Sequence, residues 1–184
     1  MEPSLSKLLE AIASPEGAKG RDVHWKQVEK ELGFEFPTSF KDFIGHYGES
    51  QWFDLYSSAL YPQSVDGVDE YKKSLQGVHE TVDKYGIRKE EEIDGKPVQL
   101  YPESGGLLFF MSSSDGDYYF WQMCSKNPDK WPMFVWQVPG LFKLEEKTIA
   151  QLLQKTFEDF RNDQPERLWV FFTGCGEVNA RGVS

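Results

Sequence analysis

Cysteine and histidine are scarce in this chain of 184 residues, which has two of the first and three of the second. Cys124 and Cys175 do not form a CxxC pair, and the chain has no HExxH motif, so the sequence predicts no metal site. We expect both thiols to be buried and reduced, because free cysteine is among the most buried residue types.

Long apolar runs are also missing. Residues 1–17 lack a basic region ahead of a continuous hydrophobic stretch, and no segment reaches the roughly 20 apolar residues that span a bilayer. The sequence therefore predicts neither a signal peptide nor a membrane span, and we expect a cytoplasmic protein.

Basic residues are outnumbered, with 20 Lys and Arg against 30 Asp and Glu, and the formal net charge is -10. A protein that binds the phosphate backbone needs a basic surface, so direct binding to nucleic acid is disfavoured. An acidic surface suits a basic protein partner, although many proteins are acidic for solubility alone.

Catalytic signatures are absent as well. The chain has no GxSxG motif, and Gly105-Gly106 is not followed by the helix and lysine of a phosphate loop. The segment 112–117, SSSDGD, lacks the alternating acids of a calcium loop, and a hairpin turn explains it better. We expect a protein that is not an enzyme and that needs no cofactor.

The segment 25–48, WKQVEKELGFEFPTSFKDFIGHYG, predicts two short helices joined by an elbow. The first carries apolar residues at helical spacing and ends at Gly33, a natural C-cap. Pro37 breaks the pattern, and Thr38 or Ser39 can cap the second helix. That helix has one apolar face and ends at Gly48; the face consists of Phe40, Phe43, Ile44 and Tyr47.

The segment 107–123 predicts a pair of antiparallel strands. A two-residue turn at Asp115-Gly116 would place Ser114 opposite Asp117 and Phe110 opposite Trp121. Both faces of this pair are apolar, so we expect it in the middle of a sheet that is covered on both sides. Further strands are predicted at 52–55, 98–101, 133–138 and 168–173, with a loose tail over 174–184.

Three more helices are predicted around these strands. The first covers 5–12, the second starts at Asp66 and ends at Gly86, and the third covers 148–160 behind a capping box of Thr148 and Gln151. The prediction is a single α+β domain over 1–184, with a central antiparallel sheet, an N-terminal helical hairpin and further helices packed around the sheet.

The order of these motifs resembles the SUKH superfamily of the Smi/Knr type, which includes bacterial immunity proteins and fungal cell-wall regulators. The resemblance covers about residues 22–162 and leaves 163–184 as a C-terminal strand and tail. It comprises a Trp-x-x-x-Glu opening, a Leu-Gly, a proline, an aromatic helix closed by Tyr-Gly, an Asp-Gly hairpin and a Trp-Pro. We expect the residues of these motifs to be structural: Trp25, Leu32, Gly33, Pro37, Phe40, Tyr47, Gly48, Gly116, Trp121, Trp131 and Pro132.

The resemblance implies an immunity protein that neutralises a cognate, nuclease-type toxin by direct binding. The alternative is a regulatory scaffold of the kind that controls cell-wall synthesis. An acidic protein could occlude the basic cleft of a nuclease, and we place such contacts at acidic residues: Asp66, Asp69, Glu70, Glu90, Glu91, Glu92, Asp94, Asp115 and Asp117. Trp25, Tyr47, Trp121 and Trp131 could be partner hot spots, but core packing is favoured. Nothing in the sequence sets the oligomeric state.

Overall fold

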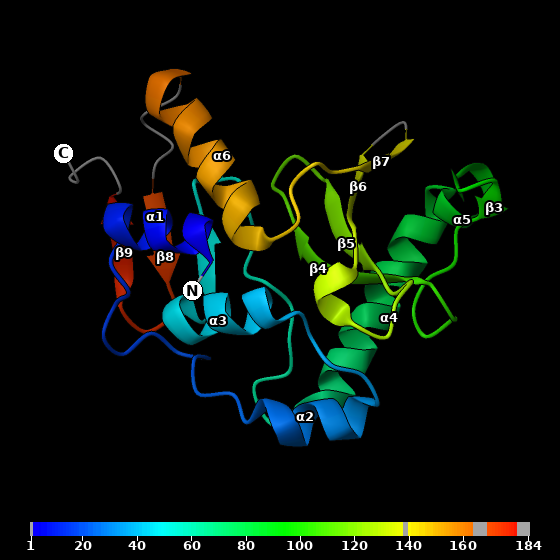
Figure 1. The fold of residues 1–184 in the computed structure, drawn as a ribbon, viewed down its shortest axis with the longest axis horizontal. Coiled ribbons are helices and arrows are strands. Elements are labelled where there is room, and N and C mark those ends of the chain that lie inside the picture. The colour runs from blue at the N-terminus through cyan, green and yellow to red at the C-terminus, as the bar shows by residue number, and fades with distance from the viewer. Residues whose placement is uncertain (1, 138–139, 164–168, 180–184) are drawn as a thin grey trace.

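Two antiparallel sheets form the centre of the computed structural model, which describes residues 2–137, 140–163 and 169–179 (Figure 1). The larger sheet has the order β4-β5-β6-β7, from strands β4 (Leu107–Ser112), β5 (Tyr118–Gln122), β6 (Met133–Gln137) and β7 (Gly140–Lys143). The smaller has the order β1-β8-β9, from β1 (Ser50–Trp52), β8 (Trp169–Phe172) and β9 (Gly176–Asn179). A separate hairpin pairs β2 (Glu92–Ile93) with β3 (Lys96–Pro97). The expected α+β class is confirmed.

Tyr56 joins the two sheets. Its backbone forms an antiparallel bridge with Trp52 on one side and with Ser113 on the other. The Trp52 and Tyr56 amides donate to each other's carbonyl oxygens, at 3.0 and 2.8 Å. The central sheet is therefore interrupted rather than continuous, because a single residue carries the pairing from β1 to the β4–β5 hairpin.

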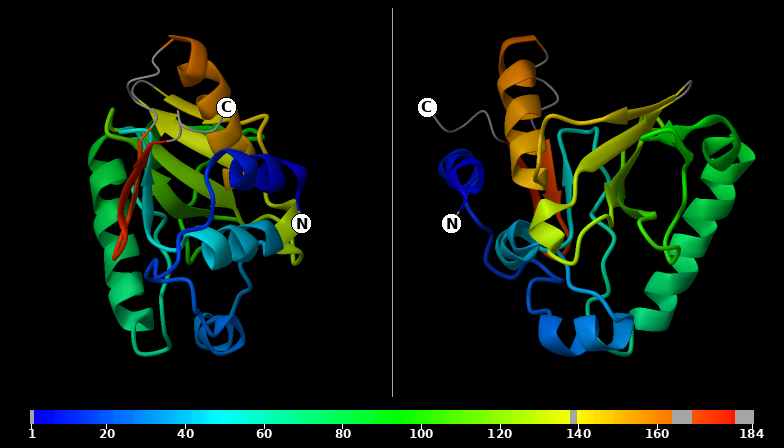
Figure 2. Two further views of the ribbon diagram at one scale, coloured as in Figure 1. Left: turned by 90° about the vertical axis from the view of Figure 1, so that its left-hand side faces the viewer. Right: turned by 45° about the vertical axis from the view of Figure 1, so that its right-hand side comes forward.

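Helices cover the two sides of these sheets unequally (Figures 1 and 2). Helices α1 (Pro3–Ala11), α3 (Thr38–Tyr47) and α6 (Ile149–Asp163) lie on one side, and α4 (Val68–Lys84) lies on the other, behind the larger sheet. Helices α2 (Trp25–Leu32) and α5 (Ile87–Glu90) and the 3-10 turn η1 (Pro128–Lys130) complete the fold. Because α4 backs only the larger sheet, no helix of the described ranges lies over one face of β1-β8-β9.

The core lies between the sheets and these helices. On the side of α3, Tyr47 packs edge-on against Trp52, with ring centroids 4.8 Å apart. On the side of α4, the helix contributes four buried side chains to the core: Val68, Tyr71, Leu75 and Val82. The apolar faces that the periodicity predicts for the helices are the faces that meet the sheets.

The predicted helical hairpin is confirmed as α2 and α3, with Gly33 in the left-handed conformation at φ 77. Glu29 holds the elbow, because its Oε1 accepts from the Phe36 amide at 2.9 Å and from Lys41 Nζ at 2.8 Å. The predicted cap of α3 is wrong. Thr38 is already helical, and its amide donates to the carboxylate of Asp129 from a distant segment.

The predicted register of the β4–β5 hairpin is also wrong. The Ser113 amide donates to the Asp117 carbonyl oxygen at 2.9 Å, and Gly116 is left-handed at φ 90, so the loop has three residues rather than two. Ser112 therefore pairs with Tyr118. An irregularity between Phe109 and Met111 follows, and Phe110 still stacks on Trp121 with centroids 4.1 Å apart.

Several boundaries differ from the sequence predictions. Residues 176–179 form β9 instead of a tail. The strand predicted at 98–101 is reduced to an isolated parallel bridge between Leu100 and Leu107. Helix α4 begins at Val68 rather than Asp66, with Gly67 as its N-cap. The strand predicted at 52–55 is β1, displaced toward the N-terminus. Residues 138, 168 and 180–184 of the predicted strands and tail lie outside the described residues.

Both cysteines are exposed, so the prediction of buried thiols is wrong. Cys175 lies in the turn between β8 and β9, where its Sγ donates to the Glu16 carbonyl oxygen at 2.9 Å. The predicted capping box at α6 is present. The Gln151 amide donates to Thr148 Oγ1 at 3.1 Å, and the Gln151 side chain accepts from the Lys147 amide at 2.7 Å.

Candidate protein-binding site

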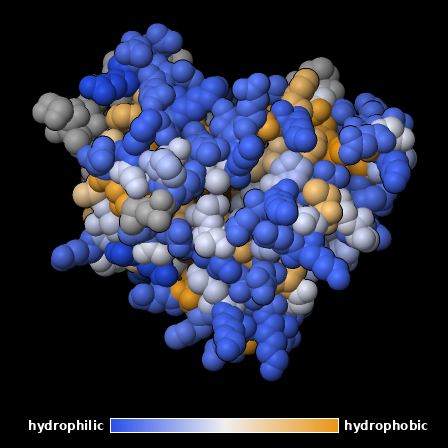
Figure 3. Space-filling model, in the orientation of Figure 1, coloured by the Kyte–Doolittle hydropathy of each residue, from blue (hydrophilic) through white to orange (hydrophobic). Residues whose placement is uncertain are grey.

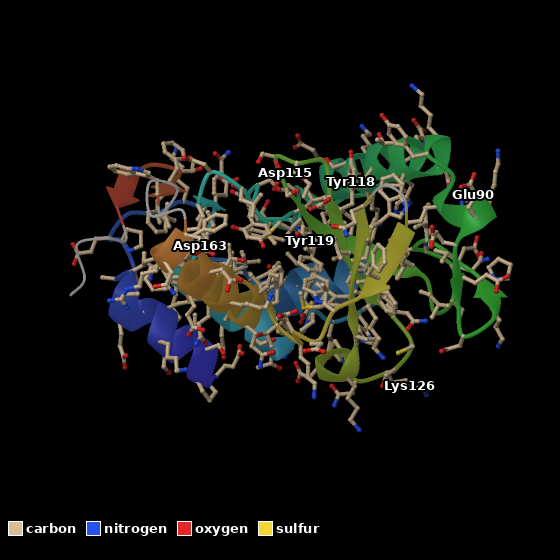
Figure 4. The ribbon with its side chains drawn as sticks, turned by 90° about the horizontal axis from the view of Figure 1, so that it is seen from above. Glu90, Asp115, Tyr118, Tyr119, Lys126 and Asp163 are labelled. Atoms are coloured by element: carbon tan, nitrogen blue, oxygen red, sulfur yellow. The ribbon has the colours of Figure 1, made fainter. Side chains whose placement is uncertain are left out.

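The acidic residues predicted to meet a partner lie in three separate places. Asp66, Asp69 and Glu70 are at the beginning of α4, residues 90–94 are around α5 and β2 beyond its end, and Asp115 and Asp117 are on the β4–β5 hairpin. The 17 residues of α4 hold the first two groups about 25 Å apart. Figure 4 shows Glu90 and Asp115 on different elements, well separated. The structure does not bring the nine carboxylates into one patch.

Glu91 has a structural contact that its neighbours lack. Its Oε2 accepts from the Leu141 amide at 3.0 Å, which ties α5 to the outer edge of β7. Glu90, Glu92 and Asp94 are exposed. Glu90, Glu92 and Asp94 can therefore meet a partner without loss of a side-chain hydrogen bond to any described residue.

The motif aromatics lie in or against the core. Tyr47 is fully buried and donates from its hydroxyl to the Ile12 carbonyl oxygen at 2.9 Å. Trp121 and Trp131 are also buried, and Trp131 Nε1 donates to the Ser125 carbonyl oxygen at 2.6 Å. Trp25 is half-buried against the ring of Phe36. These four residues therefore present little surface to a partner.

The outer face of β8 carries two large aromatic side chains in the open. Trp169 is 38% and Phe171 is 41% exposed, whereas Val170 and Phe172, which alternate with them and point inward, are 0% exposed. Solitary exposed apolar residues are common, but two exposed rings on one strand face form a contiguous surface. Exposed aromatics of this kind are typical of protein-binding hot spots.

A groove of about 480 Å³ runs beside these rings. It lies where the smaller sheet meets the β4–β5 hairpin, so it is built by the junction at Tyr56. The residues that line it are Gln51, Asp54, Leu55, Tyr56, Ser57, Ser113, Ser114, Trp169 and Phe171.

A tight turn at Phe53 and Asp54 brings Asp54 to the wall of the groove. Both residues are left-handed, with φ 61 and φ 52, a conformation that aspartate tolerates and that is unusual for phenylalanine. The Phe53 amide donates to the Trp169 carbonyl oxygen at 2.6 Å, and Ser114 Oγ donates to the Asp54 carbonyl oxygen at 3.1 Å. The turn is thereby held between β8 and the hairpin, which accounts for the persistence of its strained backbone.

The groove is negatively charged at Asp54. Among the nine residues that line it, Asp54 is the one acidic side chain, and the exposed Asp115 follows the lining residue Ser114. Burial raises the pKa of Tyr56, whose hydroxyl lies 2.9 Å from Thr156 Oγ1, so this tyrosine stays neutral. The groove therefore combines aromatic rings, hydroxyl groups and one carboxylate.

Trp169, Phe171 and Asp54 are not among the residues that the sequence predicts to meet a partner. The segment 168–172, LWVFF, is apolar throughout, so its pattern does not show which side chains point outward. Asp54 lies between predicted elements and carries no motif. The preference of aspartate for turns could have suggested a bend there, but not its position beside β8.

The face of the molecule shown in Figure 3 is mostly hydrophilic, and its hydrophobic residues gather mainly beside β6 and β7. Phe142 of β7 is 48% exposed and is the other large aromatic on an exposed strand position. Within the described ranges, no cluster of three or more Cys, His, Asp or Glu residues could hold a metal ion. No helix in the described part of the chain is both long and apolar enough to cross a membrane.

Comparison with known proteins identifies a family for this chain. The model of the SUKH_6 family, described as SMI1-KNR4 cell-wall, matches residues 22–160. No curated protein and no solved structure matches the chain. The match includes the helical hairpin of α2 and α3 and the β4–β5 hairpin with the following Trp131-Pro132, and it ends within α6. This chain is a member of the SUKH superfamily, in its SMI1-KNR4 branch.

Proposed function

We propose that this chain is a cytoplasmic, non-enzymatic immunity protein that neutralises a cognate nuclease-type toxin by direct binding. Membership of the SMI1-KNR4 family supports a protein-binding role. The observation that carries the proposal is the open groove at β8, where Trp169 and Phe171 are exposed beside the carboxylate of Asp54.

The charge of the chain fits a basic partner. Nucleases bind phosphate through basic clefts, and a protein with a net charge of -10 would be steered toward such a cleft. Steering acts mainly on the association rate and is screened by salt, whereas buried aromatic contacts act mainly on the dissociation rate. The groove supplies the aromatic contacts that slow dissociation, and the exposed carboxylates supply the steering that speeds association.

A nuclease toxin from the same genome provides the test. We expect its activity to disappear as the chain is added to one molar equivalent, with an association rate that falls as salt is raised. Undiminished nuclease activity in excess chain, with no complex on gel filtration, would contradict the proposal. A variant carrying Trp169→Ala and Phe171→Ala should bind at least about tenfold more weakly. Phe142→Ala removes an equally exposed aromatic on β7 and should leave the affinity unchanged.

Charge reversal separates the three acidic groups. Glu90→Lys with Glu92→Lys should slow association if the α5–β2 group faces the toxin, and Glu91 is kept because it supports β7. Asp66→Lys with Asp69→Lys tests the beginning of α4, and Asp115→Lys tests the hairpin. A group whose reversal changes neither affinity nor association rate does not face the toxin.

The description of the matched family as cell-wall supports the alternative, a regulatory scaffold of cell-wall synthesis. Under that alternative, the groove would hold a housekeeping protein and no nuclease would lose activity. The inhibition assay therefore distinguishes the two functions.

A further inference from the structure

The two exposed rings of β8 are arranged around the carboxylate of Asp54. Trp169 and Phe171 are two residues apart on one face of the strand, which separates their Cα atoms by about 6.6 Å. The antiparallel register places Gln51 beside Phe171, and the amide contact of Phe53 places the Asp54 turn beside Trp169. Two ring faces, a side-chain amide and a carboxylate therefore border one groove.

The polar groups of the groove differ in whether they already have partners. Ser57 Oγ lies 3.0 Å from the Ser112 amide, and Ser114 Oγ donates to the Asp54 carbonyl oxygen. The Asp54 carboxylate, in contrast, has no hydrogen bond and no ion pair with any described residue, and it is exposed. It is thus the one lining group with a charge left to pair.

An arginine side chain fits this combination of groups. Its planar guanidinium stacks on aromatic rings and forms paired hydrogen bonds with a carboxylate, and it is more weakly hydrated than an ammonium group. Gln51 can accept a further hydrogen bond through its amide oxygen. A lysine ammonium is compact and more strongly hydrated, so it uses the two rings less well.

We infer that the groove binds an arginine side chain presented by a loop of a basic protein partner, with the guanidinium stacked on Trp169 and Phe171 and paired with Asp54. The commitment to a basic protein rests on the proposed function and on charge complementarity, since the charged lining residue is acidic and the chain carries -10. The same charge argues against a second copy of this chain as the occupant, because two acidic grooves would repel each other.

The test uses N-acetylarginine amide as the probe and the amide NMR spectrum of the full chain as the readout. We expect the probe to shift the indole N–H signal of Trp169 and the side-chain amide of Gln51. N-Acetylcitrulline amide has nearly the same shape without the charge and should bind about tenfold more weakly. N-Acetyllysine amide should also bind more weakly than the arginine probe.

Two variants locate the binding. Asp54→Asn removes the charge and leaves in place the backbone carbonyl that accepts from Ser114 Oγ. Asparagine also tolerates the left-handed backbone, so the fold should persist. The affinity for the arginine probe should fall about fivefold in Asp54→Asn. Trp169→Leu should lower it by a similar factor through loss of ring stacking. Asp22→Asn neutralises an exposed carboxylate in the loop before α2, which has no assigned role, and should leave binding of the arginine probe unchanged. The unperturbed part of each spectrum verifies the fold.

The inference is overturned if arginine shifts no groove signal, if citrulline binds equally well, or if Asp54→Asn binds like the wild type. It is also overturned if toxin neutralisation survives unchanged in Asp54→Asn and Trp169→Leu, and the proposed function then stands without it. If the probe binds as expected but no nuclease is inhibited, the arginine site stands and the proposed function fails.

Discussion

The carboxylate of Asp129 accepts two hydrogen bonds from Thr38, at 2.6 Å from the backbone amide and at 3.0 Å from Oγ1. Thr38 is the first residue of α3, and Asp129 lies in η1, just before Trp131-Pro132. The helical-hairpin motif and the Trp-Pro motif of the family are therefore in contact at the N-terminus of α3, where a carboxylate is favourable.

Replacement of Asp129 by alanine should lower the free energy of unfolding by about 1 kcal/mol, because the amide of Thr38 loses its acceptor. Asp129→Asn keeps an acceptor and loses the charge, so its effect should be smaller. Urea unfolding of both variants measures the difference. An alanine variant as stable as the wild type would show that water replaces the carboxylate without cost.

Two glycines of the helical hairpin should differ sharply when each is replaced by alanine. Gly48 has φ 59 and ψ -140, and a Cβ there would lie 2.1 Å from the Lys19 carbonyl oxygen. Gly33 is also left-handed but has open space around it. Gly48→Ala should cost more than about 3 kcal/mol, and Gly33→Ala about 1 kcal/mol. Thermal and urea unfolding test the ranking, which similar losses at the two positions would refute.

Glu2 should make the protein less stable as pH rises. Burial raises the pKa of its carboxyl group, which also lies near Asp42 and accepts from Thr148 Oγ1 at 2.6 Å. The folded state then holds the proton more tightly than the unfolded state, so the stability from the protonated form is lost as pH rises through the raised pKa. Glu2→Gln should remove this slope. The difference in unfolding free energy between wild type and variant, followed from acid to neutral pH, isolates Glu2 from the other carboxylates.

His79 should make the protein less stable as pH falls. Burial lowers its pKa, its Nε2 is buried without a hydrogen-bond partner in the described part of the chain, and Asp83 and Arg88 lie nearby. The unfolded state then binds the proton more readily, so stability is full above the pKa of an unfolded histidine and is lost as pH falls below it. His79→Gln should flatten the stability curve between about pH 7 and pH 5. A slope unchanged in the variant would place the effect on another group.

Sequence periodicity predicted the elements of this fold well and their pairing less well. Helices α2, α3 and α6 follow from local spacing and from caps such as Gly33, and all three are present. The β4–β5 register depended on a three-residue loop, stabilised by Ser113 Oγ accepting from the Asp117 amide, that the Asp-Gly pair did not indicate. The cap of α3 came from Asp129, which no local pattern could supply.

The sequence by itself determined the α+β class, the family and the aromatic core, because these depend on periodicity, turn residues and the order of motifs along the chain. Only the tertiary structure decided which side chains of 168–173 face outward, because burial depends on the elements that cover a face. Helix α4 backs one sheet and leaves the other open, so Trp169 and Phe171 are exposed while Phe172 is buried. The length of the same helix holds the acidic residues apart, and the groove at Asp54 exists because Tyr56 joins two sheets.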